Sequence, residues 1–398
     1  MFLAQRFWFS RAWRIIGRIG RPQVRKSLQG IWGLAAGFVA VTFADSVFGL
    51  LPRSGAWADV LVPAKFWLAI SVFGYLGVKL VHGLEWGLKQ TLRVAASPLA
   101  ENLDKGRREF FKYAAYAAGT LPFFAGAYGF AEERLNFQVE KVEIPIEGLP
   151  EGLEGLRIAQ LSDIHASEFM PLEDVRRAVQ MANALRADMT VVTGDFITGH
   201  KDPLAECIAE LSALEAPLGV WGCNGNHEIY ARAEEKAQQL FAQYGMRLLR
   251  HENAELAWRG AKFNLIGVDY QRDRTVTGKK LMMLKGIEPM VRRDVPNILL
   301  SHNPNSFPRA AEAGIELMLA GHTHGGQVRV EIVDRTFTPA SFYTRFVAGA
   351  YQLPAATMNG NGGNWTSQLY VNRGLGTIGM PVRLGVSPEI TLVTLRKA

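Results

Sequence analysis

The order of apolar and polar residues divides the chain into two parts near residue 131. The first part contains three long apolar runs, Ile31 to Leu51, Val60 to Val81 and Tyr113 to Ala131. Each has about the 20 residues that a helix needs to cross the hydrocarbon core of a bilayer. The first two runs are apolar on all sides, unlike the striped helices of a soluble domain. We therefore expect a membrane region with about three transmembrane helices at residues 30–131.

A basic segment precedes these runs. Residues 1–29 carry seven Lys and Arg and no Asp or Glu, interleaved with Phe and Trp. This composition favours an amphipathic helix at the membrane interface, and a solvated basic tail is the alternative.

The part after residue 131 alternates short, β-branched apolar runs with amphipathic segments. Six runs are predicted to be buried strands: Arg157 to Leu161, Met189 to Val192, Val220 to Cys223, Asn264 to Val268, Ile298 to Leu300 and Glu316 to Leu319. Three segments are predicted to be helices: Asp174 to Leu185, Leu204 to Leu214 and Glu234 to Tyr244. A strand-rich tail follows, at Gln327 to Ile332, Leu369 to Asn372 and Glu389 to Leu395. The Asn- and Gly-rich run 359–364 is predicted to connect two strands.

Charge is distributed unevenly along the 398 residues. The net charge of +7 divides into +9 for residues 1–138 and −2 for the remainder. Because the larger part is slightly acidic, we expect no nucleic-acid partner. Hydrophobic residues make up 48% of the chain and charged residues 20%, which excludes global disorder. The two cysteines, Cys207 and Cys223, indicate no redox compartment.

The basic residues also predict how the chain is oriented in a membrane. Residues 106–112, Gly-Arg-Arg-Glu-Phe-Phe-Lys, precede the third apolar run and resemble a twin-arginine export signal. The alternative is a positive-inside anchor, and both interpretations place the later residues outside the cytoplasm. We therefore expect a multi-pass protein of the bacterial inner membrane with its catalytic domain on the periplasmic side. Membrane lipids and the twin-arginine machinery are its expected partners.

Polar residues directly follow five of the six predicted strands. They are Asp163 and His165, Asp195, Asn226 and His227, His302, and His322 and His324. Sites in open α/β sheets form at the carboxyl ends of strands, so these residues are expected to converge. Each motif alone is common in turns and caps, but five of the eight histidines fall in this one series.

The ligand types indicate the chemistry. Carboxylate, imidazole and amide groups without a thiolate suit Mn, Fe or Zn. A carboxylate can bridge two ions, which favours a dinuclear centre. We expect Asp163 and His165 to lie on an extended segment with both side chains on one side.

The series of motifs resembles the calcineurin-like metallophosphoesterase superfamily. Segments 325–327, 339–351, 372–377 and 388–392 look like its bacterial membrane-attached phosphodiesterase branch. The resemblance implies a four-layer αββα sandwich at residues 140–398. It also implies two divalent metal ions. Asp163, His165, Asp195 and His324 would hold one ion, and Asp195, Asn226, His302 and His322 the other. His227 would be catalytic and off the metals.

The expected function follows from this resemblance. It is the hydrolysis of a phosphate ester, by a phosphodiesterase or pyrophosphohydrolase. The aromatic residues Phe337, Phe342, Tyr343, Phe346 and Tyr351 suit a lipid-linked phosphate near the bilayer, or else belong to the core. The alternative function is a non-catalytic, membrane-anchored binding protein that retains the fold. Residues 374–379 fit a dinucleotide-binding pattern, but Pro381 prevents the helix that this site needs.

Overall fold

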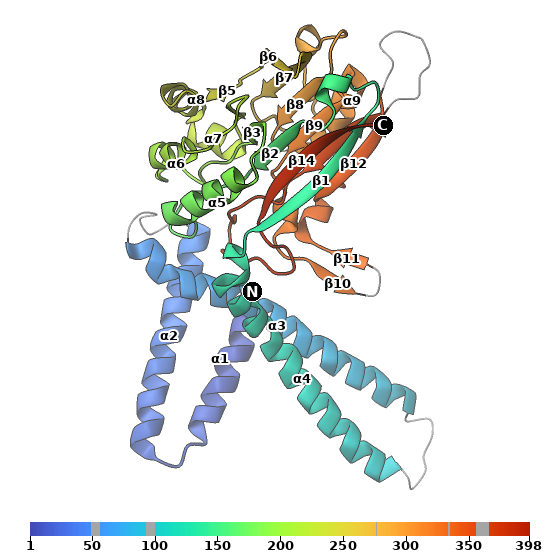
Figure 1. Cartoon of the computed structure of the whole chain (residues 1–398). Helices are drawn as coiled ribbons and strands as arrows, with labels where there is room; N and C mark the ends of the chain where they lie inside the picture. The colour runs from blue at the N-terminus through green and yellow to red at the C-terminus, as the bar shows by residue number, and fades with distance from the viewer. Residues whose placement is uncertain (49–55, 93–99, 276, 333–334, 356–365) are drawn as a thin grey trace. The chain divides into compact units, whose positions relative to one another are not determined.

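The chain forms two compact units in a computed structural model, residues 1–128 and residues 129–398. The structure describes residues 1–48, 56–92, 100–275, 277–332, 335–355 and 366–398 (Figure 1). Residues 49–51, where the first predicted span ends, and the predicted connection 359–364 lie outside these ranges.

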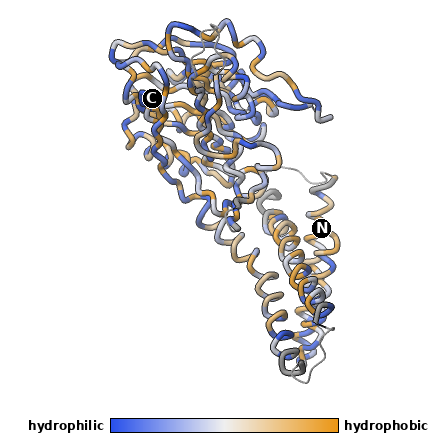
Figure 2. Tube along the Cα trace, turned by 90° about the vertical axis from the view of Figure 1, so that its right-hand side faces the viewer, coloured by the Kyte–Doolittle hydropathy of each residue, from blue (hydrophilic) through white to orange (hydrophobic). Residues whose placement is uncertain are grey.

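The first unit consists of four helices. They are α1 (Phe2–Gly17), α2 (Pro22–Phe48), α3 (Ala56–Leu92) and α4 (Ala100–Ala131). Long apolar stretches lie within these helices, whereas short apolar and polar stretches alternate in the second unit (Figure 2). Among the described residues, two helical segments are long and apolar enough to cross a membrane, Pro22–Asp45 and Pro63–Gln90. The third predicted span lies within α4, which does not meet this criterion, and it stays a prediction.

Helices α3 and α4 approach each other closely where both carry small residues. A Cβ atom on Gly74 would lie 2.6 Å from the carbonyl oxygen of Gly119, and one on Gly77 would lie 2.8 Å from that of Ala118. Small residues of this kind let helix backbones pack tightly in membranes.

The basic amino-terminal segment is a packed helix and not a solvated tail. Gln5 on α1 donates a hydrogen bond to the Ser71 hydroxyl on α3 at 2.7 Å and accepts one from the indole of Trp67 at 2.8 Å. The Trp8 indole also donates to the Ser71 carbonyl. Aromatic side chains of α1 therefore face α3, as expected of an amphipathic helix.

The second unit is built on two six-stranded mixed sheets. The first has the order β1-β14-β2-β3-β4-β5 and the second β12-β13-β9-β8-β7-β6. Their strands are β1 (Gln138–Ile146), β2 (Arg157–Leu161), β3 (Met189–Val192), β4 (Val220–Gly222), β5 (Arg247–Leu248), β6 (Glu252–Trp258), β7 (Ala261–Val268), β8 (Asn297–Ser301), β9 (Leu317–Ala320), β12 (Gly349–Pro354), β13 (Thr366–Val371) and β14 (Glu389–Lys397). A separate hairpin contains β10 (Val330–Ile332) and β11 (Arg335–Phe337).

The two sheets form the inner layers of the unit, and helices form the outer layers. One apolar cluster joins residues of both sheets, including Ile158 of β2 and Leu300 of β8. A second cluster joins the first sheet to α5 (Leu172–Ala184), α6 (Leu204–Leu211) and α8 (Glu234–Gln243). A third joins the second sheet to α9 (Phe307–Ala313). The predicted αββα sandwich is confirmed.

Parallel strands β2, β3 and β4 of one sheet and β7, β8 and β9 of the other end at the same place in the unit. The Gln160 side chain joins the two sheets there, because its amide donates to the Thr193 hydroxyl at 3.0 Å and to the Ala320 carbonyl at 2.9 Å. The carboxyl ends of both sets of strands therefore surround one site.

Candidate metal centre

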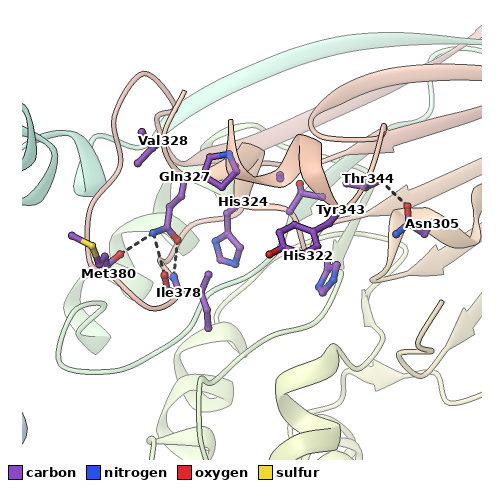
Figure 3. A pocket seen from close by; sticks show the side chains of 13 residues that line it. Asn305, His322, His324, Gln327, Val328, Tyr343, Thr344, Ile378 and Met380 are labelled. Atoms are coloured by element: carbon purple, nitrogen blue, oxygen red, sulfur yellow. Dashed lines mark hydrogen bonds between the residues drawn. The ribbon is translucent and has the colours of Figure 1, made fainter. Parts of the chain in front are cut away.

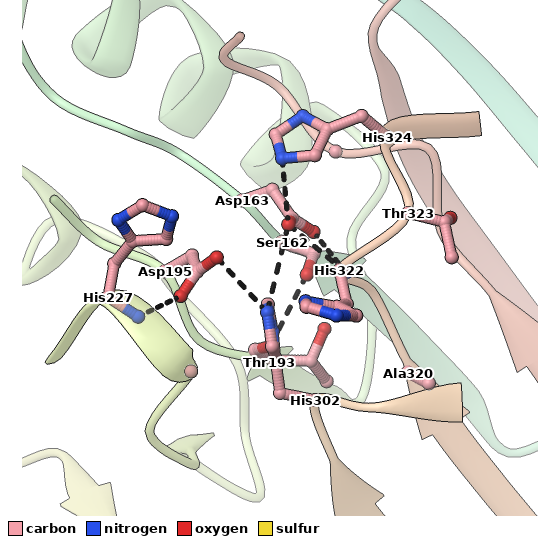
Figure 4. A network of polar contacts seen from close by, with 12 residues as sticks. Ser162, Asp163, Thr193, Asp195, His227, His302, Ala320, His322, Thr323 and His324 are labelled. Carbon is pink, nitrogen blue, oxygen red and sulfur yellow. Dashed lines mark hydrogen bonds and ion pairs between the residues drawn. The ribbon is translucent and has the colours of Figure 1, made fainter. Parts of the chain in front are cut away.

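Carboxylates and imidazoles that follow five strands meet at this site (Figure 4). His324 Nε2 lies 3.2 Å from Asp163 Oδ1, and His302 Nε2 lies 3.1 Å from Asp195 Oδ2. His165 Nε2 lies 3.5 Å from Asp195 Oδ2 and 3.2 Å from His324 Nε2. Ligand atoms within 4.8 Å of one another form three overlapping groups. These are Asp163, His165 and His324; His165, Asp195 and His227; and Asp195, His302 and His322.

Hydrogen bonds on the outer side of the site fix the direction of the imidazoles. His302 Nδ1 lies 2.6 Å from the Thr193 carbonyl, and His324 Nδ1 lies 3.3 Å from the Gly376 carbonyl. A carbonyl only accepts hydrogen bonds, so each Nδ1 carries a hydrogen, and in the neutral imidazole each Nε2 presents a lone pair to the centre. This arrangement is typical of histidines that bind metals.

The backbone reaches these positions by left-handed turns and not by an extended segment. Asp163, His165 and Asp195 have φ angles of 48°, 49° and 56°. The expectation that Asp163 and His165 share one face of an extended segment is therefore wrong, because β2 ends at Leu161. Hydrogen bonds to the neighbouring loop bring the two residues together instead, from Asp163 N to Gly194 O and from His165 N to Asp195 O, each at 3.0 Å.

Glycines allow the two carboxylates to lie against backbone. A Cβ atom on Gly225 would lie 2.1 Å from Asp195 Oδ1, and one on Gly321 would lie 2.3 Å from Asp163 Oδ2. The Asp163 carboxylate also accepts a hydrogen bond from the His322 backbone N–H at 3.0 Å. Residues with a side chain at either glycine would displace a carboxylate.

Burial and charge act against each other at the site. Burial lowers the pKa of His165 to about 3 and that of His322 to about 4. Burial also lowers the pKa of His302, but the charges of Asp195 and Asp163 outweigh it and raise that pKa to about 10. The neighbouring imidazoles, His302 first, hold the pKa of Asp195 well below its usual range despite its burial. The site thus combines an ionised Asp195 carboxylate with two imidazoles that resist protonation, those of His165 and His322, and with one that binds a proton readily, that of His302.

The residues present fit divalent metal ions. The Asn226 amide oxygen is buried and has no hydrogen-bond partner in the described part of the chain. A buried oxygen without a partner is expected where it binds a metal ion. The Nε2 atoms of His165 and His324 lie 3.2 Å apart, a close approach that a cation bound by both would stabilise. Nitrogen and oxygen donors without thiolate suit Mn, Fe or Zn.

His227 lies at the edge of the site. Its backbone N–H donates to Asp195 Oδ1 at 2.9 Å, and its Nδ1 lies 2.6 Å from the Thr198 carbonyl. Its ring is half-buried and lies 4.8 Å from the ring of His165. One edge of the imidazole is thus held by the protein while the ring remains partly accessible.

The motif analysis missed two buried charged residues that hold the site. The Glu228 carboxylate accepts hydrogen bonds from the backbone N–H groups of Gly225, Asp195, Phe196 and Ile197 at 2.8 to 3.3 Å. Its place three residues after Gly225, at the start of α7 (Asn226–Ala231), is a capping position that could have identified it.

Arg383 is the second, and no local pattern in the sequence indicates it. Its guanidinium donates to carbonyl groups of the segment 373–376. The dinucleotide-like run 374–379 begins in this segment and forms a loop without a helix, as Pro381 predicts. The loop contacts Asp163, because Gly376 N donates to the Asp163 carbonyl at 2.7 Å.

An apolar pocket of about 400 Å³ adjoins the histidines (Figure 3). Its walls include His322, His324, Val328, Tyr343, Ile378 and Met380. Of the five aromatic residues predicted to contact a lipid or the core, Phe346 is buried and Tyr351 is half-buried, whereas Phe337, Phe342 and Tyr343 are exposed. The aromatic segment is therefore partly core and partly exposed, and its contact with a lipid stays a prediction.

An αββα sandwich with a histidine and aspartate cluster at its strand ends defines a metallophosphoesterase. The chain belongs to the calcineurin-like phosphoesterase family, whose model matches residues 156–326. An uncharacterized metallophosphoesterase of Aquifex aeolicus is 31% identical over 279 residues, which cover 68% of this chain and 96% of that protein.

Two further relatives carry informative names. A bovine (Bos taurus) transmembrane protein with metallophosphoesterase domain is 32% identical over 271 residues, which cover 65% of this chain but 57% of that protein's length. The phosphodiesterase YaeI of Escherichia coli is 28% identical over 242 residues, which cover 60% of this chain and 82% of that protein. The predicted superfamily is confirmed, and the name of the bovine relative together with the apolar helices indicates membrane association.

Proposed function

We propose that the chain is a metal-dependent hydrolase of phosphate esters with a dinuclear centre. One ion is held by Asp163, His165, Asp195 and His324, and the other by Asp195, Asn226, His302 and His322. The observation that carries this proposal is the convergence of carboxylate oxygens and imidazole Nε2 atoms within 4.8 Å at a buried site. When bound, two such ions activate a water molecule and neutralise charge on the phosphoryl oxygens.

The protein groups have separate roles in this reaction. Asp195 Oδ2 lies 3.5 Å from His165 Nε2 and 3.1 Å from His302 Nε2, so the Asp195 carboxylate could contact both ions. The hydrogen bond from His227 Nδ1 to the Thr198 carbonyl leaves Nε2 without a backbone partner, so the imidazolium form of the ring could give its Nε2 proton to the leaving group and become neutral. Glu228 holds the Asp195 backbone in position.

We further propose that the substrate is a lipid-linked phosphate. The pocket beside His322 and His324 has mostly apolar walls, which suit the hydrocarbon part of an amphipathic molecule. The apolar helices α2 and α3, together with the third apolar run in α4, are proposed to anchor the chain in the inner membrane, with the catalytic unit outside the cytoplasm. Export by the twin-arginine route is part of this proposal and rests on residues 106–112.

The test is turnover by the purified full-length protein in detergent, after treatment with a chelator and addition of Mn²⁺. Candidate substrates are a soluble diester, a monoester, a lipid-linked pyrophosphate and a cyclic nucleotide. We expect metal-dependent hydrolysis of the diester and the highest kcat/KM for the lipid-linked compound. Absence of turnover on all four would favour the non-catalytic binding protein, and preference for the cyclic nucleotide would contradict the lipid proposal.

A further inference from the structure

Six exposed apolar side chains lie on segments that also carry residues lining the hollows beside the metal site. They are Leu281, Met282, Val330, Phe337, Phe342 and Tyr343, which we call the apolar rim. Phe342 is 87% exposed, Tyr343 82% and Met282 70%. Single apolar residues on a surface are ordinary, but a group of large ones beside a site indicates a surface that binds something.

Hydrogen bonds connect the segments that carry the rim. The Asn305 side chain accepts a hydrogen bond from the Thr344 hydroxyl at 2.6 Å and donates one to the Asp273 carboxylate at 3.1 Å. Asp273 belongs to a small hairpin, in which the Leu281 N–H donates to the Asp273 carbonyl at 2.7 Å. The loops that carry Leu281 and Tyr343 are thereby held together, and both residues line a common hollow.

Two rim residues belong to the separate hairpin. Val330 and Phe337 are directly paired across the hairpin of β10 and β11. That hairpin follows Val328, which lines the apolar pocket together with Tyr343. Phe342 and Tyr343 line a further hollow together with His322, so the rim reaches the metal site itself.

Basic residues accompany the rim. The segment 270–285 contains five Lys or Arg and one acidic residue, Asp273. The exposed residues Arg274, Lys280 and Arg345 line the hollow beside Tyr343, and within the described ranges none of them forms an ion pair with a carboxylate. The acidic residues there have partners already, since Asp273 binds Asn305 and Glu312 pairs with Arg309.

We propose that the apolar rim and its basic residues dock on the surface of an anionic lipid bilayer. Exposed aromatic and aliphatic side chains beside cationic ones are the combination that binds a membrane interface, where the apolar groups enter the lipid and the cations meet the headgroups. The proposal rests on the membrane anchoring proposed above. It goes further, because it places the entrance of the metal site at the headgroup level, where a lipid-linked phosphate would be located.

The length of the chain permits this contact. Six residues, 132–137, lie between the end of α4 and the start of β1. A connection of this length spans at most about 20 Å. If α4 lies in the membrane, as predicted from its apolar run, the second unit begins within that distance of the bilayer.

The test uses the full-length protein in lipid nanodiscs. Cys207 and Cys223 are buried, so a Phe342→Cys variant can be labelled selectively with an environment-sensitive fluorophore. A Tyr244→Cys variant, at an exposed site beyond the end of α8, is the matched control. The nanodiscs contain phosphatidylcholine alone or mixed with phosphatidylglycerol, each with and without a spin-labelled quencher lipid.

We expect the label at position 342, but not that at 244, to shift to shorter wavelength and to be quenched by the spin-labelled lipid. Quenching should be stronger with phosphatidylglycerol and should weaken at high salt or in an Arg274→Gln, Lys280→Gln background. Equal and weak quenching at both positions would overturn the proposal. A wavelength shift without lipid quenching would also overturn it and would indicate a protein partner.

Hydrolysis of a soluble diester, measured on the same nanodiscs, separates this proposal from the proposed function. Turnover without quenching at position 342 would overturn the docking surface alone. Quenching without turnover would support the docking surface and overturn the hydrolase.

Discussion

A lysine in place of Arg383 should weaken one metal site without removing the other. Arg383 is fully buried, and burial lowers its pKa to about 10, so it stays charged at neutral pH. Its guanidinium donates to the carbonyl groups of Arg373 and Gly374 at 2.9 Å and Gly376 at 2.6 Å, and more weakly to Val386 at 3.4 Å. One planar group thus holds a whole loop.

That loop supports ligands of only one proposed ion. Leu375 N donates to the Ser162 carbonyl at 3.0 Å, and Gly376 N donates to the Asp163 carbonyl. The Gly376 carbonyl also faces Nδ1 of His324. Loss of the guanidinium should therefore displace Asp163 and His324. In the described structure, His302 and His322 form no hydrogen bond with this loop.

The magnitude follows from the hydrogen bonds. The single nitrogen of Lys cannot reproduce the fork, so we count at least two of the four carbonyl groups as unpaired. Each buried, unpaired acceptor costs about 1–3 kcal/mol, and the variant should lose about 2–6 kcal/mol of stability in this loop. Groups that orient metal ligands typically change affinity 10- to 100-fold, which is about 1.4–2.7 kcal/mol.

The assay is a titration of metal-free protein with Mn²⁺, in which the number of bound ions is measured at each Mn²⁺ concentration. We expect Arg383→Lys to bind one ion with unchanged affinity and the other 10- to 100-fold more weakly. Arg396→Lys, which changes an exposed ion pair, is the matched control and should match the wild type. Equal weakening of both ions, or none, would refute the reasoning about the loop.

Three further predictions concern catalysis, topology and stability. His227→Ala should keep both metals and lose about 10²-fold or more in kcat, with the smallest loss for substrates that have good leaving groups. His200→Ala is the control and should keep the wild-type kcat. Loss of metal from His227→Ala would instead make His227 a metal ligand. Arg107→Lys with Arg108→Lys should leave a carboxyl-terminal reporter in the cytoplasm, and normal export would refute the twin-arginine interpretation. Burial raises the pKa of Glu316 to about 7. The free energy of unfolding of the wild type should therefore fall as pH rises from about 4.5 to about 7, because the folded protein resists ionisation of this carboxyl. The stability of Glu316→Gln relative to the wild type should increase over the same range, measured by denaturant unfolding. A constant difference in stability would contradict this pKa.

The central strands could be predicted from the sequence, but the strands at the edges of the sheets could not. The runs at β2 and β3 are mostly apolar because nearly all of their residues are buried, and their bounds were predicted without error. Strand β1 contains Glu140, Lys141 and Glu143 and is exposed on one face, which conceals it among polar segments. Its partner is β14, more than 240 residues away, and such pairing leaves no local signal.

The site divides in a similar way. Motifs at strand ends identified the residues that converge, because the carboxyl ends of parallel strands share one edge. The left-handed turns at Asp163 and His165 could not be predicted, since non-glycine residues adopt them only when tertiary contacts impose them. Arg383 was missed for the same reason, because it acts through backbone carbonyls that any sequence provides.

The number of metal ions per chain tests the central claim most directly. Elemental analysis and electron paramagnetic resonance of the Mn²⁺-loaded, full-length protein would measure the count and the magnetic coupling between ions. We predict two coupled Mn²⁺ ions per chain in the wild type, and one uncoupled ion or none in Asp195→Asn, because Asp195 is the carboxylate placed between both sets of histidines. A single ion in the wild type, or two coupled ions with full turnover in Asp195→Asn, would contradict the dinuclear site.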